Sequence, residues 1–152
     1  MMKQKLPAPM MAAFAEAEAA AVRGEVPVGA VITDAKGNII AQAGNRTLEL
    51  KDPTAHAELL AIRAAAQMLH SERLIDCDLY VTLEPCAMCA AAISFARIRR
   101  VYFAASDEKM GAVENGSRFF SQSTCHHAPE VYSGIGEAQA KTMLTQFFKS
   151  RR

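Results

Sequence analysis

Two short segments, His56-Ala57-Glu58 and Pro85-Cys86-Ala87-Met88-Cys89, constrain this chain more than any other feature. His56, Cys86 and Cys89 supply the nitrogen and sulfur ligands that zinc prefers, and three protein ligands leave a position for water. Zinc lowers the pKa of a bound water from about 15.7 towards about 7, so hydroxide forms at neutral pH. The fold must therefore bring two distant segments to one metal ion, and we expect hydrolytic chemistry there.

The spacing of the cysteines suits one metal ion. Cys86 and Cys89 are three residues apart, so both lie on one face of any helix that they begin. Pro85 suits the first helical position, where its missing N–H costs nothing. A helix N-terminus also favours thiolate over thiol. Two thiolates and one imidazole favour zinc over iron.

Glu58 is expected to act on the water and not on the metal. The segment Asp52-Pro53-Thr54 predicts a helix start, which places His56 and Glu58 in the first turn. Residues two apart diverge by about 200° on a helix. We therefore interpret Glu58 as the proton shuttle, because its long side chain can reach a metal-bound water.

Other interpretations of these residues exist. The Cys-x-x-Cys pair could be a redox pair. His56 alone would more often be a core histidine, and Glu58 alone a surface charge. A purely structural zinc site would need a fourth protein ligand, for which the candidates are Cys77, Cys125, His126 and His127. We prefer an open catalytic site, because it explains both segments together.

The whole chain has the size of one domain. Its 152 residues, taken here as a single domain over 1–152, can bury a core of their own. A net charge of +1 excludes a broadly basic nucleic-acid coat, so RNA contacts must come from local patches. The two cysteines outside the metal motif suggest no disulfide framework, and a reducing cytoplasmic location fits best.

The N-terminus partly imitates a secretory signal, with Lys3 and Lys5 before an apolar stretch. Pro7 and Pro9 interrupt that stretch, so we expect a cytoplasmic helix that runs through Val22 and ends near Gly24. No run of about 18 apolar residues exists to span a membrane.

Hydrophobic patterning predicts alternating strands and helices. Strands are expected at 26–33, 39–43, 78–83 and 99–104, and helices at 55–70, from the cysteines to near 96, and at 136–149. The segment 107–123 is expected to be irregular. This alternation indicates an α/β sandwich.

Several segments around the zinc motif form a recognisable series, which is Glu25 to Val31, Asn45-Arg46, Asp52 to Glu58, Leu79 to Ala90, Arg97 to Val101, Asp107 to Ala112 and Phe147 to Arg152. With these segments the chain closely resembles bacterial tRNA-specific adenosine deaminases, which belong to the cytidine-deaminase-like superfamily. The zinc motif by itself points to the superfamily, the flanking segments add the narrower family, and the resemblance covers nearly the whole domain.

The resemblance implies a cytidine-deaminase-like three-layer α/β/α sandwich with a five-stranded mixed sheet. It implies a homodimer with one zinc ion per subunit, held by His56, Cys86 and Cys89. The implied reaction converts the wobble adenosine of a tRNA anticodon stem-loop to inosine, with Glu58 moving the protons.

The resemblance also assigns substrate contacts. Asn45 would hydrogen-bond the purine, and Asp107 would lie near the substrate sugar. On the residues alone, each is about as well explained as a turn residue. The remaining residues expected to line the base pocket, which could equally be ordinary strand residues, are Val26, Ala57 through its backbone, Leu83 and Glu84.

The C-terminus is the expected RNA contact. The cations Lys149, Arg151 and Arg152 stand beside the aromatic residues Phe147 and Phe148, and such groups bind phosphates and stack on unpaired bases. The alternative is a helix whose phenylalanines are core, and we expect these to be partly core.

Two further segments are less specific. The arginines at 97, 99 and 100 could face RNA, although a solvated face or salt bridges across a dimer explain them equally well. The segment 113–134 departs from the family pattern, and its pair His126-His127 is expected to be a hydrogen-bonding loop element and not a second metal site.

Two rival functions remain. The first is deamination of a free nucleobase or nucleoside, such as guanine or cytosine, by the same zinc site. An RNA enzyme should lose affinity with salt, whereas a free-base enzyme should not. The second is a noncatalytic zinc-stabilised RNA-binding module, in which replacing Glu58 would leave every measurable function intact.

Overall fold

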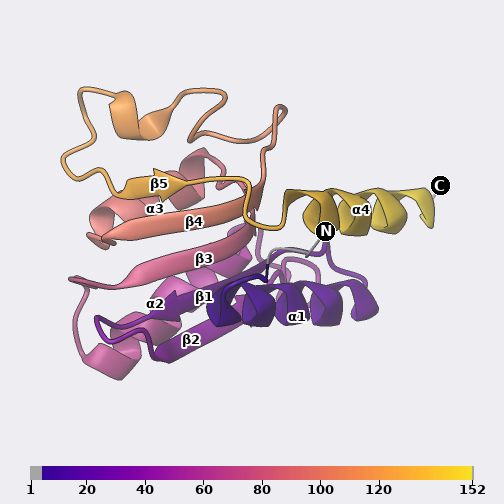
Figure 1. Ribbon diagram of the computed structural model, residues 1–152, viewed down its shortest axis with the longest axis horizontal. Coiled ribbons are helices and arrows are strands. Elements are labelled where there is room, and N and C mark those ends of the chain that lie inside the picture. Colours follow the sequence, from indigo (N-terminus) through magenta and orange to yellow (C-terminus); the bar gives the residue numbers. More distant parts are fainter. Residues whose placement is uncertain (1–4, 152) are drawn as a thin grey trace.

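The apolar segments of the sequence pair into one sheet (Figure 1). The computed structural model describes residues 5–151. The strands lie in the order β2-β1-β3-β4-β5. β1 is antiparallel to both β2 and β3, whereas β3, β4 and β5 run parallel. Their bounds are β1 Gly29–Thr33, β2 Ile39–Gly44, β3 Asp78–Leu83, β4 Arg100–Ala105 and β5 Glu130–Tyr132. The five-stranded mixed sheet is therefore confirmed.

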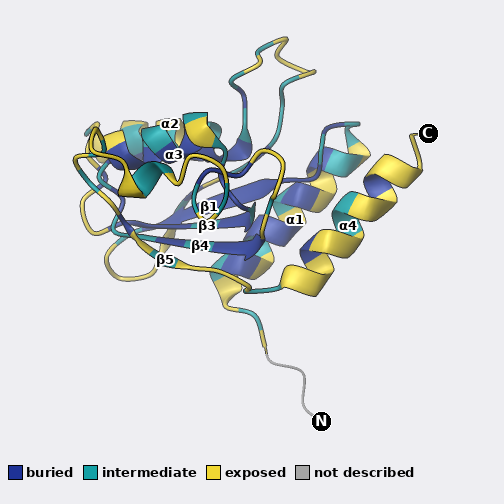
Figure 2. Ribbon diagram, turned by 90° about the horizontal axis from the view of Figure 1, so that it is seen from above, coloured by how far each residue is buried: buried dark blue, intermediate teal, exposed yellow. Residues whose placement is uncertain are grey.

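Helices cover both faces of the sheet (Figure 2). α1 and α4 lie on one face, where Phe14 and Ala140 pack in the same buried cluster as Val31 of β1. α2 and α3 lie on the other, where Ala61 and Ile93 pack with the remaining core. The helices are α1 Ala8–Val22, α2 Ala57–Leu69, α3 Ala87–Phe95 and α4 Glu137–Lys149. The predicted three-layer α/β/α sandwich is confirmed.

α1 packs unusually close to the hairpin of β1 and β2. A Cβ at Gly29 would lie 1.8 Å from the carbonyl oxygen of Ala13 and 2.7 Å from the nitrogen of Ala17. Ala13 and Ala17 are themselves fully buried. The alanine-rich helix thus has small side chains where the sheet backbone approaches it, as dense packing requires.

Several sequence predictions need adjustment at their edges. The first strand begins at Gly29 and not at 26, because 26–28 form a tight turn in which the Val28 N–H bonds the Val26 carbonyl at 2.8 Å. The segment 107–123 contains a short 3-10 helix over Phe119–Ser121. Of the helices described, none has the length and apolar character to cross a membrane.

Candidate active site

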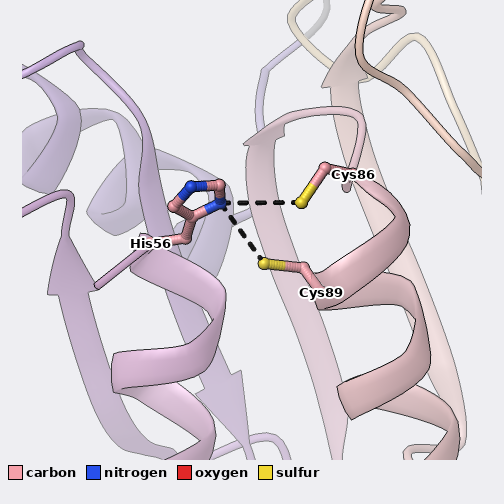
Figure 3. Close-up of side chains that lie close together, drawn as sticks. All are labelled: His56, Cys86 and Cys89. Carbon is pink, nitrogen blue, oxygen red and sulfur yellow. Dashed lines mark hydrogen bonds between the residues drawn. The ribbon is translucent and has the colours of Figure 1, made fainter. Parts of the chain in front are cut away.

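His56 lies at the N-cap of α2 and not in its first turn. The predicted start at 52–54 is wrong, because Asp52 Oδ1 accepts hydrogen bonds from the Thr54 backbone and hydroxyl and closes a separate turn. The His56 backbone is extended, with φ -76° and ψ 151°. Its imidazole points across to α3 (Figure 3).

Cys86 is the N-cap of α3, and Cys89 is a residue of its first turn. The sequence had suggested Pro85 as the first helical residue, and this prediction is wrong, because the helix begins after Cys86. It lies in the turn after β3, where its carbonyl accepts a 2.9 Å hydrogen bond from Ala112. Both thiols still lie at a helix N-terminus, where the helix dipole favours the thiolate.

The three side chains form one cluster of ligand atoms. The Nδ1 atom of His56 lies 3.6 Å from the sulfur of Cys86 and 3.6 Å from that of Cys89 (Figure 3). Zinc bonds of about 2.3 Å to sulfur and about 2.0 Å to nitrogen, at the tetrahedral angle, separate such atoms by about 3.5 Å. The donor set and its spacing therefore fit zinc.

The electrostatics of the two thiols favour one negative charge on Cys86. A hydrogen bond from Cys89 lowers the pKa of Cys86 to about 4, and the His56 imidazole acts in the same direction. The same hydrogen bond, together with burial, raises the pKa of Cys89. A metal ligand must be deprotonated to bind, and Cys86 already meets this condition at neutral pH.

In the part of the chain that the structure describes, no fourth protein ligand closes the zinc site. Within residues 5–151, His56, Cys86 and Cys89 are the one group of such ligand types close enough to share an ion. Cys77 is buried beside β3, and Cys125 lies 3.5 Å from the hydroxyl of Ser94. All four cysteines are free thiols. The cluster has three protein ligands, as the open-site interpretation requires.

Glu58 is buried next to this cluster, with 4% of its surface exposed. Burial raises the pKa of Glu58 to about 7 against the opposing effects of backbone hydrogen bonding and the His56 imidazole. The charges of His56 and Cys86 also act on this pKa, and Glu58 stands two residues after the ligand His56 in the chain. A carboxyl group with a pKa near neutral can both accept and donate a proton.

Asn45 reaches the same helix end from a preceding loop. Its Oδ1 accepts a 2.8 Å hydrogen bond from the N–H of Ala57 and so satisfies an otherwise free donor of α2. Arg23 in turn donates to the Asn45 carbonyl at 3.1 Å. Asn45 is thus a helix cap as well as a candidate purine ligand, and the purine contact stays a prediction.

Glu84 holds a loop with its side chain, and its predicted place in the wall of the base pocket stays a prediction. Its side chain is buried, and both oxygens accept hydrogen bonds from the segment 107–115. Asp107 belongs to that segment and accepts from the N–H groups of Lys109 and Met110, both at 3.1 Å. The capped-turn interpretation of Asp107 is confirmed, and its substrate contact stays a prediction.

Of the other expected pocket residues, Ala57 directly follows the ligand His56 in the chain and Leu83 precedes the ligand Cys86 by three residues. Val26 and Leu83 are half-buried and pack against the core cluster that contains Ala57. The sequence analysis missed Glu25, which is buried and accepts hydrogen bonds from the N–H groups of Leu48 and Glu49. Glu25 stands directly before the apolar run that begins at Val26, and a charge at such an edge is normally exposed, so no signal in the sequence marked it as buried.

The C-terminal residues separate into core and surface. Phe147 is buried, whereas Phe148 is 48% exposed and Lys149 is exposed. The Arg151 guanidinium lies 4.2 Å from the centre of the Phe147 ring, a cation–π contact. The expectation of partly core aromatics is confirmed. Arg152 lies outside the described residues.

The central arginines are paired within the chain. Arg99 makes a bidentate contact with Asp78, with both distances at 3.0 Å, and Arg100 bonds Glu130 at 3.2 Å. These ion pairs lie within the chain, so RNA contact and salt bridges across a dimer both stay predictions. His127 Nε2 lies 2.7 Å from the carbonyl oxygen of Ile98, which confirms it as a hydrogen-bonding loop element.

Residues 3–105 match the family described as the cytidine and deoxycytidylate deaminase zinc-binding region. The fold and the site therefore define a zinc-dependent deaminase. Over 143 residues the chain is 60% identical to the tRNA-specific adenosine deaminase of Agrobacterium fabrum, covering 94% of this chain and 93% of that protein. The chain belongs to the family of tRNA-specific adenosine deaminases.

Solved structures support this placement. One, from a study of A-to-I editing by tRNA:A34 deaminases at the wobble position of transfer RNA, has a TM-score of 0.88 and 60% identity, covering 90% of this chain and 98% of that one. A guanine deaminase from Bacillus subtilis has a TM-score of 0.64 and 33% identity, covering 94% and 91%. The ligand cluster thus belongs to a fold shared by enzymes with different substrates.

Proposed function

We propose that this protein hydrolyses the wobble adenosine of a tRNA anticodon to inosine. The observation that carries the proposal is the cluster of His56, Cys86 and Cys89 with the buried carboxyl of Glu58 against it. The likeness to tRNA-specific adenosine deaminases at 60% identity supports adenosine in tRNA as the substrate.

The proposed reaction exchanges an amine for an oxygen. His56, Cys86 and Cys89 would hold zinc, and the bound ion would lower the pKa of water and so supply a nucleophile at neutral pH. Glu58 accepts a proton from the attacking water and delivers it to N1 of adenine while oxygen bonds to C6. Glu58 then passes the second proton to the amine, the C6–N bond breaks, and ammonia leaves.

The substrate base is proposed to enter beside the N-terminus of α2. Asn45 is held there by its bond to Ala57, and its amide has both the donor and the acceptor that a purine edge requires. Val26, Ala57 and Leu83 form the surrounding wall. Asp107 is proposed to contact the sugar from the opposite side, on the segment that Glu84 holds.

The anticodon stem-loop is proposed to contact the end of α4. Phe148 and Lys149 are exposed there, and Arg151 is held on the ring of Phe147. Arg151 also lies beside the loop after α1, since a Cβ at Gly24 would be 3.8 Å from its Nη2 atom. Aromatic and cationic groups of this kind stack on bases and neutralise phosphates.

A homodimer in the cytoplasm is also proposed. Phe95 on α3 is 75% exposed, and the half-buried Ala91 precedes it by one turn on the same helix face. A large exposed apolar side chain beside small ones favours a protein interface. The cytoplasm supplies both tRNA and the reducing conditions that free thiols need.

The test is inosine formation in an anticodon stem-loop that carries a wobble adenosine. The same assay is run on Glu58→Ala and on a stem-loop with guanosine at the wobble position. The proposal is supported if inosine forms only when the wild-type protein acts on the stem-loop with adenosine, and not with Glu58→Ala or with guanosine at the wobble position. An inert adenosine stem-loop, with zinc bound at one equivalent, contradicts it.

Deamination of a free nucleobase is the second candidate, because the chain is 33% identical to a guanine deaminase. Ammonia release from free adenine, guanine and cytosine is measured beside the stem-loop. Release from a free base, unchanged by salt, would move the protein to this class, since phosphate contacts make RNA affinity fall with salt.

A further inference from the structure

Glu84 is a buried charged residue that the proposed reaction does not use. It follows β3, precedes the ligand Cys86 by two residues, and has 3% of its surface exposed. Among the described residues, no hydrogen bond joins Glu84 to the side chains of His56, Glu58, Cys86 or Cys89. A buried charge is costly unless hydrogen bonds compensate it, so its partners indicate what the residue does.

All the partners of the Glu84 carboxylate come from one segment, residues 107–115, here called the 107–115 loop. Oε1 accepts from the Asp107 N–H at 3.0 Å and from the Asn115 side-chain amide at 2.7 Å. Oε2 accepts from the N–H groups of Val113, Glu114 and Asn115 at 3.0, 2.9 and 3.1 Å. One side chain thus holds both ends of the loop.

The middle of the loop also lies against the carboxylate. A Cβ at Gly111 would lie 2.5 Å from the Glu84 Cδ atom and 2.4 Å from the Asp107 carbonyl oxygen. No side chain fits in that space, so glycine permits the backbone to close around the carboxylate. The loop therefore meets Glu84 at both of its ends and at Gly111.

The same loop is joined to the metal-ligand segment. Gly111 forms an antiparallel bridge with Cys86, and the N–H of Ala112 bonds the Pro85 carbonyl at 2.9 Å. The position of the loop relative to the catalytic zinc ligands is thus set by Glu84 and by the backbone just after it. Asp107, the proposed substrate contact, stands at the first of these anchors.

A carboxylate suits this place and an amide does not. An ionised carboxylate has two oxygens that accept about four hydrogen bonds, whereas a glutamine replaces one oxygen by a donor. Here each oxygen accepts from at least two N–H groups. In a glutamine, the NH₂ group would replace one of these oxygens and face N–H donors, so the hydrogen bonds on that side would be lost.

We propose that Glu84 is a positioning residue, which holds the 107–115 loop at the substrate side of the active site and thereby sets the affinity for substrate without contacting it. This inference rests on the proposed function in one respect, the substrate contact of Asp107. The sequence-based expectation that Glu84 lines the base pocket stays a prediction, and a positioning role needs no such contact.

The first test measures the loop directly and needs no substrate. Hydrogen exchange is compared between the zinc-loaded wild-type protein and Glu84→Gln. We expect faster exchange at the amides of Asp107, Val113 and Glu114, and unchanged exchange at Leu48 and Glu49, which Glu25 holds. Unchanged exchange in the 107–115 loop would overturn the proposal.

The second test separates binding from chemistry. Glu84→Gln should raise KM for the stem-loop by about tenfold or more while kcat changes far less and zinc stays at one per chain, because a misplaced substrate contact weakens binding. Gly111→Ala should also raise KM with little change in kcat. The KM of the double variant should be close to that of either single variant, since both changes disturb the same contact. An unchanged KM, or activity lost only in proportion to zinc, would overturn the proposal.

A stability control excludes general loosening. Leu74 is fully buried and precedes the opposite end of β3, so Leu74→Ala lowers stability without touching the loop. Its KM should equal that of the wild-type protein. If the wild-type protein deaminates a free base and not the stem-loop, the proposed function fails. The role of Glu84 is then tested by comparing KM for that base between the wild-type protein and Glu84→Gln.

Discussion

At the scale of single residues, Glu58 is the group on which the chemistry depends. It is the buried carboxyl at the ligand cluster, and burial brings its pKa to about 7. Glu58→Gln keeps the shape but cannot carry a proton, so we expect kcat to fall by about 10² to 10⁴. Metal analysis should still find one zinc per chain. A kcat within a few-fold of the wild-type value would contradict the assignment.

Glu25 makes stability depend on pH. Burial raises its pKa, but hydrogen bonds from Glu49, Leu48 and Thr47 outweigh burial, so the pKa lies below the ordinary value of 4.5. A lowered pKa in the folded state means that the unfolded chain binds the proton more tightly. The stabilisation is therefore complete above about pH 4.5 and disappears as the pH falls through the lower folded value.

The expected result is a difference between two melting curves. Between pH 6 and pH 3, the melting temperature of the wild-type protein should fall further than that of Glu25→Gln, which has no proton to bind. At pH 7 the variant should be less stable by about 1 to 2 kcal/mol, because it loses charged hydrogen bonds. If the melting temperatures of the two proteins fall in parallel between pH 6 and pH 3, Glu25 does not contribute to the pH dependence of stability.

At the scale of elements, the contact of α1 with β1 depends on one glycine. A Cβ at Gly29 would overlap the backbone of Ala13, so Gly29→Ala should push the helix from the sheet and cost about 1 to 3 kcal/mol of overpacking. Urea unfolding measures this cost. Gly37→Ala is the control, because nothing lies within 4 Å of its Cβ and only its positive φ of 86° is strained.

The cost of that control should be about 1 to 2 kcal/mol, which is the cost of left-handed backbone alone. Backbone strain without side-chain contact should leave the near-ultraviolet spectrum unchanged in Gly37→Ala. Gly29→Ala should alter it, because Phe14 of α1 packs in the cluster with Val31 of β1. Identical spectra for both variants would contradict the close-packing argument.

The elements themselves were predicted well where periodicity is strong and less well at their ends. Residues 78–83 form β3 as expected, and both later helices end where expected. The starts of α2 and α3 were placed too early, because their caps come from His56 and Cys86. β5 has three residues, too few for a hydrophobic period, and only the family resemblance suggested it.

At the scale of the whole molecule, α3 is proposed to face a second copy of the chain. Phe95→Asp places a charge where the proposed interface excludes water, so we expect the dimer to dissociate, with light scattering giving the mass of one chain of 16.4 kDa. Phe148→Asp is the matched control, an exposed phenylalanine on α4, and it should leave the mass unchanged. A dimer that survives Phe95→Asp would place the interface elsewhere.

The sequence by itself determined the kind of metal site, the layer architecture and the family. Ligand type and spacing are local properties, and hydrophobic periodicity reports which face of each element is buried. These predictions depend on residues that are neighbours in the chain or that repeat along it. His56, Cys86 and Cys89 were accordingly found without the structure, and their 3.6 Å spacing confirmed them as one group.

Only the tertiary structure decided which polar groups meet across the fold. Asn45 caps α2 from another loop, Glu84 holds the 107–115 loop, and Arg99 pairs with Asp78. No periodicity marks such partners, because each bond joins segments that folding alone brings together. A buried polar group must be satisfied wherever the backbone offers a donor, and that choice exists only once the sheet and its helices are assembled.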